Sequence, residues 1–290
     1  MTTPISLQES PSQSATSATQ ARAVIINVDD LGLSTAVNEA VIQLAERGRI
    51  GATSYMADGM ISDGDTRRLS ELGVDVGLHF DLTGLSKSPL KASLKSLIIA
   101  SYLRRLEPAQ VIEAIKQQLD AFEDCFNHAP VFVDGHQHVH QFPIIRQCLA
   151  SELLSRYGDG SNNAICARVT TPLSNDVKSW IIYSLGGRAW RRLCQDAHIK
   201  TNDYFGGVYN FNASYTELVT LWEQWLSHAP RKGATTLLMC HPAVPMGMWQ
   251  DDIKAARERE YEWLMSGEFE ALLEKHEVQL LKWSDIAHYK

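Results

Sequence analysis

Short apolar runs alternate along the chain with longer stretches in which apolar residues recur every three or four positions. The runs predict buried strands at residues 23–28, 52–56, 74–80, 131–133, 164–169, 204–209, 235–239 and 278–281. The longer stretches predict helices at residues 35–47, 108–126, 143–157, 175–198, 215–228 and 251–276. Strands that alternate with helices predict a parallel sheet with helices outside. Seven or eight such units predict an α/β fold, a TIM-like (β/α) barrel that could be distorted or incomplete.

Two of these helices carry recognisable end signals. Ser34 is a suitable N-cap for the helix at 35–47, and Gly48 marks its end. The helix at 108–126 starts with Pro108, which is favoured in a first turn. These signals support the alternation of strands and helices.

Residues 91–106 (KASLKSLIIASYLRRL) interrupt this alternation and predict an extra amphipathic helix. One interpretation is an insertion that packs on the body of the protein or in a homodimer interface. The alternative is contact with a membrane surface or with a lipid-linked substrate. We otherwise expect one domain over residues 21–290, since no internal repeat or shift in composition marks a second.

Composition narrows the class of protein. The chain has 290 residues, 44% of them hydrophobic, and a net charge of −7. An acidic chain is not expected to bind nucleic acid, because neutralising phosphates requires clustered Lys and Arg. The longest apolar runs are too short for a transmembrane helix, and polar residues 1–20 predict a flexible tail rather than a signal peptide. We therefore expect a soluble, cytoplasmic enzyme.

The cysteines predict reduced thiols. They are five in number, widely spaced and never in a C-x-x-C pattern: Cys125, Cys148, Cys166, Cys194 and Cys240. Such spacing is typical of small buried side chains and not of a disulfide framework or a thiolate zinc site.

Unusual polar residues follow several of the predicted strands. In a parallel barrel, the positions after the strands converge on the carboxyl-end face, where active sites form. The residues concerned are Asp29, Asp30, His79, His136, His138, His140, Arg168 and His241. So many coincidences are hard to explain by packing alone.

The run His136-Gln-His138-Val-His140 is the strongest of these signals. In an extended segment, residues two apart share a face, so the three imidazoles could point the same way. Neutral imidazole is a common metal ligand. The alternative is a set of solvated loop histidines.

Adjacent acids at Asp29 and Asp30 could divide two tasks between them. Successive side chains point in different directions, so one carboxylate could bind a metal while the other faces an attacking water. The alternative is a loop turn or helix N-terminal charges. His241, in the run LLMCHP, could act as a general acid or an oxyanion donor, or be a buried structural histidine. Arg168 could orient a carboxylate, bind a substrate oxygen or form a structural ion pair.

At these residues the sequence resembles the YdjC-like carbohydrate deacetylase family, which includes chitooligosaccharide and hopanoid-biosynthesis-associated deacetylases. The matching stretches span most of the chain in the family's order: residues 25–34 (IINVDDLGLS), 77–83 (GLHFDLT), 133–143 (VDGHQHVHQFP) and 239–243 (MCHPA). Leu31 replaces the family's usual aromatic residue, and Gln137 departs within the histidine-rich run. Both changes affect substrate fit more than chemistry.

The resemblance implies a TIM-like barrel related to that of NodB-type polysaccharide deacetylases and one divalent ion, magnesium or zinc. By position, Asp30, His79 and His136 match the family's metal ligands. Asp29 matches the acid that activates water, and His241 matches the histidine of the MCHPA motif. His138, His140 and Arg168 are then expected either to contact substrate or to hold the ligands in place.

The implied function is metal-dependent removal of an N-acetyl group from an amino sugar, oligosaccharide or glycolipid. Two histidines and one carboxylate favour zinc or another transition ion, since magnesium prefers oxygen ligands. The same combination of two histidines and one carboxylate also forms the site of non-haem iron oxygenases, which need no second acid. A non-catalytic barrel that binds sugar or metal is the remaining alternative.

Overall fold

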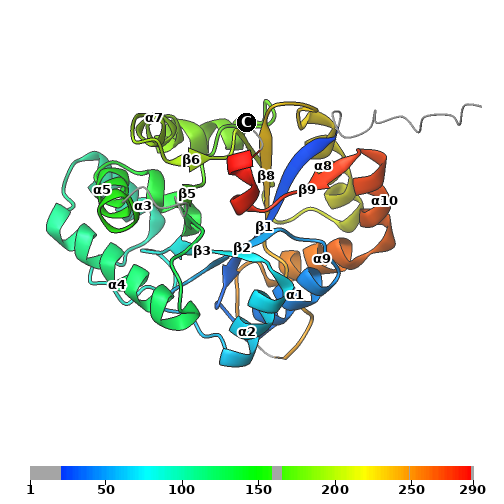
Figure 1. Cartoon of the computed structure of the whole chain (residues 1–290), viewed down its shortest axis with the longest axis horizontal. Helices are drawn as coiled ribbons and strands as arrows, with labels where there is room; N and C mark the ends of the chain where they lie inside the picture. Colours follow the sequence, from blue (N-terminus) through cyan, green and yellow to red (C-terminus); the bar gives the residue numbers. More distant parts are fainter. Residues whose placement is uncertain (1–20, 159–164, 248, 289–290) are drawn as a thin grey trace, which may run out of the picture.

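The computed structural model describes residues 21–158, 165–247 and 249–288, so the predicted tail at 1–20 lies outside the described residues. The sheet is parallel throughout and has the strand order β6-β5-β4-β3-β2-β1-β8-β7, with β9 beside β1. It curls into a barrel with helices around the outside (Figure 1). The strands are β1 (Arg22–Leu31), β2 (Ala52–Tyr55), β3 (Asp75–Phe80), β4 (Phe132–Gly135), β5 (Cys166–Ala167), β6 (Lys200–Thr201), β7 (Tyr204–Gly206), β8 (Thr235–Cys240) and β9 (Val278–Leu280).

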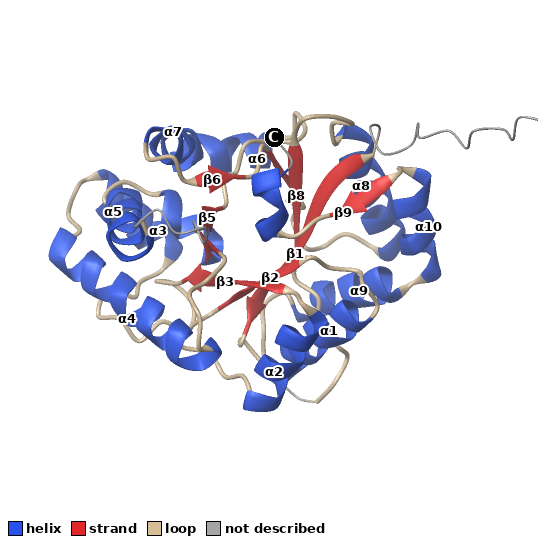
Figure 2. Ribbon diagram, in the orientation of Figure 1, coloured by secondary structure: helices blue, strands red, loops and turns tan. Residues whose placement is uncertain are grey.

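The helices lie in the connections between strands, as Figure 2 shows. They are α1 (Thr35–Glu46), α2 (Asp63–Leu72), α3 (Leu94–Tyr102), α4 (Pro108–Phe126), α5 (Ile145–Tyr157), α6 (Val177–Ile182), α7 (Arg188–Asp196), α8 (Tyr215–His228), α9 (Lys254–Met265) and α10 (Gly267–Lys275). Ser34 caps α1 and Pro108 begins α4, as predicted. In the part of the chain that the structure describes, no helix is both long and apolar enough to cross a membrane.

The predicted TIM-like barrel is confirmed, and it is incomplete on one side. Among the described residues, β6 and β7 form no ladder with each other. The gap between β6 and β7 is bridged by the chain that follows β5. There the Leu173 N–H donates to Phe205 O (3.0 Å) and the Phe205 N–H donates to Thr171 O (2.8 Å). The Asn202 side chain, which bonds both backbone groups of Val169, substitutes there for a strand.

The inside of the barrel changes from apolar to polar along each strand. On β1, Ala23 and Ile25 join an interior cluster, and the same alternation places Asn27 and Asp29 further along the inward row. The C-terminal turn η3 (Trp283–His288) lies inside the barrel (Figure 1), and Trp283 stacks on Phe132 with ring centres 4.7 Å apart. The polar residues at the carboxyl ends of the strands therefore lie next to an apolar layer inside the barrel.

Two predicted helices differ from the structure, and two elements of the structure were not predicted. The single helix expected at 175–198 is two helices separated by a π turn at η2 (Tyr183–Gly187), where Gly186 has φ +133° and lies against the Gln141 carbonyl. The helix expected at 251–276 is broken at Ser266, which caps α10. Neither α2 nor β6 was predicted: α2 buries only Leu69, so it has no apolar stripe, and β6 has two residues.

Candidate functional site

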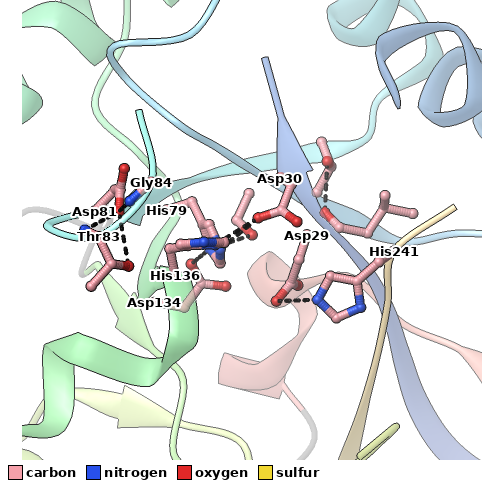
Figure 3. Close-up of polar contacts among 12 residues, drawn as sticks. Asp29, Asp30, His79, Asp81, Thr83, Gly84, Asp134, His136 and His241 are labelled. Atoms are coloured by element: carbon pink, nitrogen blue, oxygen red, sulfur yellow. Dashed lines mark hydrogen bonds and ion pairs between the residues drawn. The ribbon is translucent and has the colours of Figure 1, made fainter. Parts of the chain in front are cut away.

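The carboxyl ends of β1, β3, β4, β5 and β8 bring most of the predicted polar residues into one cluster. Figure 3 shows Asp29 and Asp30 facing His79, His136 and His241. Asp29, Asp30 and His79 are almost completely buried. The cluster therefore lies in a low-dielectric setting, where charges interact strongly.

Asp30 is the meeting point of two imidazoles. Its Oδ1 lies 3.2 Å from His79 Nε2 and 3.0 Å from His136 Nδ1. The backbone has φ +69° at Asp30, and the pairing of β1 with β2 shifts register between Val28 and Leu31. Such a bulge re-aims a side chain. Asp30 therefore points at the histidines, whereas Asp29 keeps its place in the inward row.

His79 is oriented by Asp134, which is not among the predicted site residues. Asp134 Oδ1 lies 2.6 Å from His79 Nδ1, so Nε2 faces Asp30. Burial disfavours the imidazolium, but Asp134 and then Asp30 outweigh it and raise the pKa of His79 to about 10. A cation that binds Nε2 must therefore displace a proton. A signal for Asp134 was available, since it directly follows the predicted strand at 131–133 and lies two residues before His136.

Asp29 is held by a two-pronged ion pair with Arg168. The two guanidinium nitrogens lie 2.7 Å and 2.6 Å from its oxygens, and Asn27 Nδ2 donates to Oδ1 (2.8 Å). Burial favours the neutral acid, but the charge and hydrogen bonds of Arg168 outweigh it and hold the pKa of Asp29 below its usual range. Asp29 is thus an anion at neutral pH.

Arg168 is fully buried and contacts a second carboxylate, Asp134, at 2.5 Å. Its carbonyl accepts hydrogen bonds from Trp190 Nε1 (2.9 Å) and His140 Nε2 (3.2 Å). Arg168 therefore pairs with two carboxylates, as expected of a residue that orients them or forms a structural ion pair.

His241 lies at the edge of the cluster, with Nε2 3.9 Å from Asp29 Oδ2. Its ring packs edge-on against Phe211, with centres 5.2 Å apart, and it is 13% exposed, so it is open to one side. Cys240, one residue earlier, is buried with its Sγ 3.5 Å from Asn27 O, away from the cluster.

Arg257 and Glu260, one turn apart on α9, connect Asp30 to His241. Arg257 donates to Asp30 Oδ2 (2.7 Å) and to the His241 carbonyl (3.5 Å), and it also pairs with Asp251. Glu260 accepts from the His241 N–H and from Tyr209 Oη. The sequence contains no local signal for either residue, because both lie in an ordinary charged helix.

The extended reading of the histidine run was wrong. Residues 136–141 form a 3₁₀ turn, η1 (His136–Gln141), with φ +51° at Gln137 and +60° at His138. The three imidazoles therefore separate: His136 reaches Asp30, His138 packs edge-on against Phe205, and His140 bonds the Arg168 carbonyl. Among the described contacts, no hydrogen bond joins His138 to a predicted metal ligand.

Buried His140 is expected to make the protein less stable in acid. Burial lowers the pKa of His140 to about 4, against about 6.5 in an unfolded chain. Between these values the unfolded chain binds the extra proton, so the free energy of unfolding rises with pH. The full contribution is present above about pH 6.5, and about 3 kcal/mol of it is lost by pH 4.

Urea unfolding of the protein and of His140→Gln at pH 7 and pH 4.5 measures this contribution. The variant should lose less stability between the two pH values, while exposed His128→Gln should match the unchanged protein. Equal losses in all three proteins would contradict the assignment.

Two groups of donors could hold a metal ion. In each, the ligand atoms of three residues lie within 4.8 Å of one another: Asp30, His79 and His136, or Asp29, His79 and Asp134. In the second group, both carboxylates already pair with the guanidinium of Arg168. In the first, Arg257 occupies Oδ2 of Asp30 but leaves Oδ1 between two imidazole nitrogens. The first group therefore fits a divalent cation better, with one oxygen and two nitrogen donors.

The fold and site define an α/β-barrel protein with a carboxylate and imidazole cluster at the carboxyl ends of its strands. The family profile described as "YdjC-like protein" matches residues 23–275, so the chain belongs to the YdjC-like family.

One curated relative is the chitooligosaccharide deacetylase of Enterobacter sp. (strain 638), which is 30% identical over 130 residues. That match covers 42% of this chain and 52% of the relative, so the chain spans about half the length of the relative it matches. A solved structure, a candidate cellobiose-phosphate cleavage protein from Enterococcus faecalis V583, superimposes with a TM-score of 0.67. It is 18% identical, and the match covers 92% of this chain and 99% of that one. This similarity supports the assignment of the fold.

Proposed function

We propose that this protein is a metal-dependent hydrolase that removes an acetyl group from the nitrogen of an amino sugar, free or within an oligosaccharide or glycolipid. The observation that carries the proposal is an ionised carboxylate beside the proposed metal ligands. Asp29 lies next to the donors of Asp30, His79 and His136, but its own oxygens pair with Arg168. A hydrolase that uses metal-activated water needs this separation of ligand and base. The YdjC-like family and its chitooligosaccharide deacetylase relative support the substrate class.

Asp30, His79 and His136 would hold the cation. When bound, the ion would supply Lewis acidity, which lowers the pKa of water and polarises the acyl oxygen. The mixed oxygen and nitrogen donors favour zinc over magnesium. Elemental analysis of protein purified without added metal would identify the ion.

Asp29 would take the proton from the attacking water. Arg168 keeps Asp29 ionised and holds both of its oxygens in place. The same ion pair makes the Asp29 carboxylate a weaker base. His241 Nε2, 3.9 Å from Asp29 Oδ2, would give a proton to the departing amine, which otherwise leaves poorly. The backbone bond from His241 to Glu260 positions that ring.

The test is acetate release from a panel of N-acetylated amino sugars, oligosaccharides and glycolipids, with and without a chelator. We expect release from at least one class, its loss with chelator and its recovery when metal is returned. Oxygen consumption that depends on Fe(II) would instead indicate an oxygenase. Tight binding of sugar and metal without acetate release would indicate a non-catalytic barrel.

A further inference from the structure

The exposed apolar side chains of this protein gather at one end of the barrel. Nine large hydrophobic residues are exposed among those the structure describes. Eight of them lie between the carboxyl end of a strand, the end that carries the candidate site, and the last helix before the next strand: Met60, Ile99, Tyr102, Leu103, Val177, Trp180, Ile181 and Met246. The ninth, Leu154, lies on α5. Exposed apolar groups confined to one end of a protein commonly mark an interaction surface.

Five of the eight belong to helices α3 and α6, and a sixth, Leu103, is the C-cap residue of α3. The two helices flank the same stretch of chain. Ser101 of α3 donates to the Pro143 carbonyl (2.5 Å), and Gln141 Nε2 donates to the carbonyl of Ile182 in α6 (2.9 Å). Both helices therefore lie beside the end of η1 and the residues that follow it. We call their exposed side chains, with the exposed cations of residues 87–105, the α3–α6 surface.

Helix α3 buries one side and exposes the other. Leu97 and Ser101 are buried against the body of the protein, whereas Tyr102 and Leu103 are 46% and 56% exposed. On α6, Val177 is 75% exposed. These side chains meet no covering element within the described residues, so they are available to a partner.

The charge of α3 and its flanks opposes that of the whole chain. Residues 87–107 contain five basic side chains and one acidic one, a net charge of +4, whereas the chain carries −7. All five cations are exposed: Lys87, Lys91, Lys95, Arg104 and Arg105. Among the described residues, only Lys87 of these five pairs with a carboxylate, that of Asp58 at 3.5 Å. The apolar side chains of α3 are thus bordered by free positive charge.

We infer that the α3–α6 surface binds the face of an anionic lipid bilayer. Exposed aliphatic and aromatic side chains flanked by Lys and Arg are the composition of helices that lie in a membrane interface. Each cation near an anionic surface strengthens binding, and Trp180 and Tyr102 suit the headgroup level. Bilayer binding would place the open end of the barrel toward the lipid surface.

A second copy of this chain is the less favourable partner. A symmetric dimer places the same surface of each copy opposite the other, so the two +4 segments would repel each other. Anionic lipid has the complementary charge.

The test is cosedimentation of the full chain with vesicles of phosphatidylcholine alone and of phosphatidylcholine mixed with phosphatidylglycerol. We expect binding to the anionic vesicles, weaker binding to the neutral ones, and release from the anionic vesicles at high salt. The double variant Lys91→Gln/Lys95→Gln should lower the partition coefficient about 25-fold, roughly fivefold for each charge. Lys200→Gln/Lys232→Gln removes two exposed cations at the amino ends of β6 and β8 and should have little effect.

A second pair of variants tests the apolar part. Tyr102→Ser/Leu103→Ser should weaken vesicle binding, and Leu154→Ser is the matched control at an exposed site on α5. Equal binding by all variants, equal binding to neutral and anionic vesicles, or light scattering that shows a dimer abolished by Tyr102→Ser/Leu103→Ser would overturn the inference. Asp29→Asn should bind vesicles normally, so this result is independent of the proposed chemistry.

Discussion

Replacing Asp29 by asparagine is expected to lower kcat for acetate release about 10²–10⁴-fold while the bound metal is retained. Asparagine has nearly the same shape but cannot accept the proton of the attacking water. The substitution leaves Asp30 Oδ1, the oxygen between the two imidazoles, unchanged. The measurements are kcat, the metal content of the purified variant and its thermal unfolding midpoint.

The unfolding midpoint is needed because the substitution leaves Arg168 with one carboxylate partner, Asp134. An uncompensated buried charge can destabilise the fold on its own. Leu154→Ser, at an exposed position on α5, provides the baseline for purification and assay. Activity retained by a folded, metal-loaded Asp29→Asn protein would remove Asp29 from the role of base.

Replacing Asp30 by asparagine is expected to abolish tight metal binding and, with it, acetate release. Asparagine tolerates the backbone conformation at this position, φ +69°, so the variant removes the charge without straining the turn. It also removes the carboxylate that Arg257 contacts. Metal affinity measured by calorimetry is the primary readout, because it does not depend on knowing the substrate.

Two further variants interpret that result. Arg257→Gln leaves all three proposed ligands in place and should weaken metal binding about 10–100-fold, as loss of a supporting contact does. The loss in Asp30→Asn should be larger. If Asp30→Asn binds metal normally and Asp134→Asn does not, the ion is held by Asp29, His79 and Asp134 instead.

Much of the fold followed from local patterns. The helices at α4 and α8 were predicted with the boundaries that the structure has, because each has a continuous apolar stripe and a clear first turn. Strands β1, β3 and β8 were predicted from apolar runs that are buried on both faces. Helix α2 escaped prediction because its stability comes from end capping and the chain around it, with only Leu69 buried.

The candidate site was predictable in part for a physical reason. In a parallel barrel every strand ends at the same face, so residues that follow the strands must meet, whatever the helices do. That rule selected Asp29, Asp30, His79, Arg168 and His241. It could not select Arg257, since α9 reaches Asp30 only through packing between elements far apart in sequence.

By itself, the sequence determined the parallel barrel, the end of the barrel that holds the candidate site and the residue types found there. Hydrophobic periodicity and the alternation of strands with helices can be recognised locally along the chain. The tertiary structure alone decided which partner each side chain meets. A bulge in β1 points Asp30 in a different direction from Asp29, and two residues with left-handed backbone separate the three histidines. Arg168 pairs with Asp29, whereas Arg257 pairs with Asp30. These pairings depend on backbone direction and long-range contact, which no local pattern encodes.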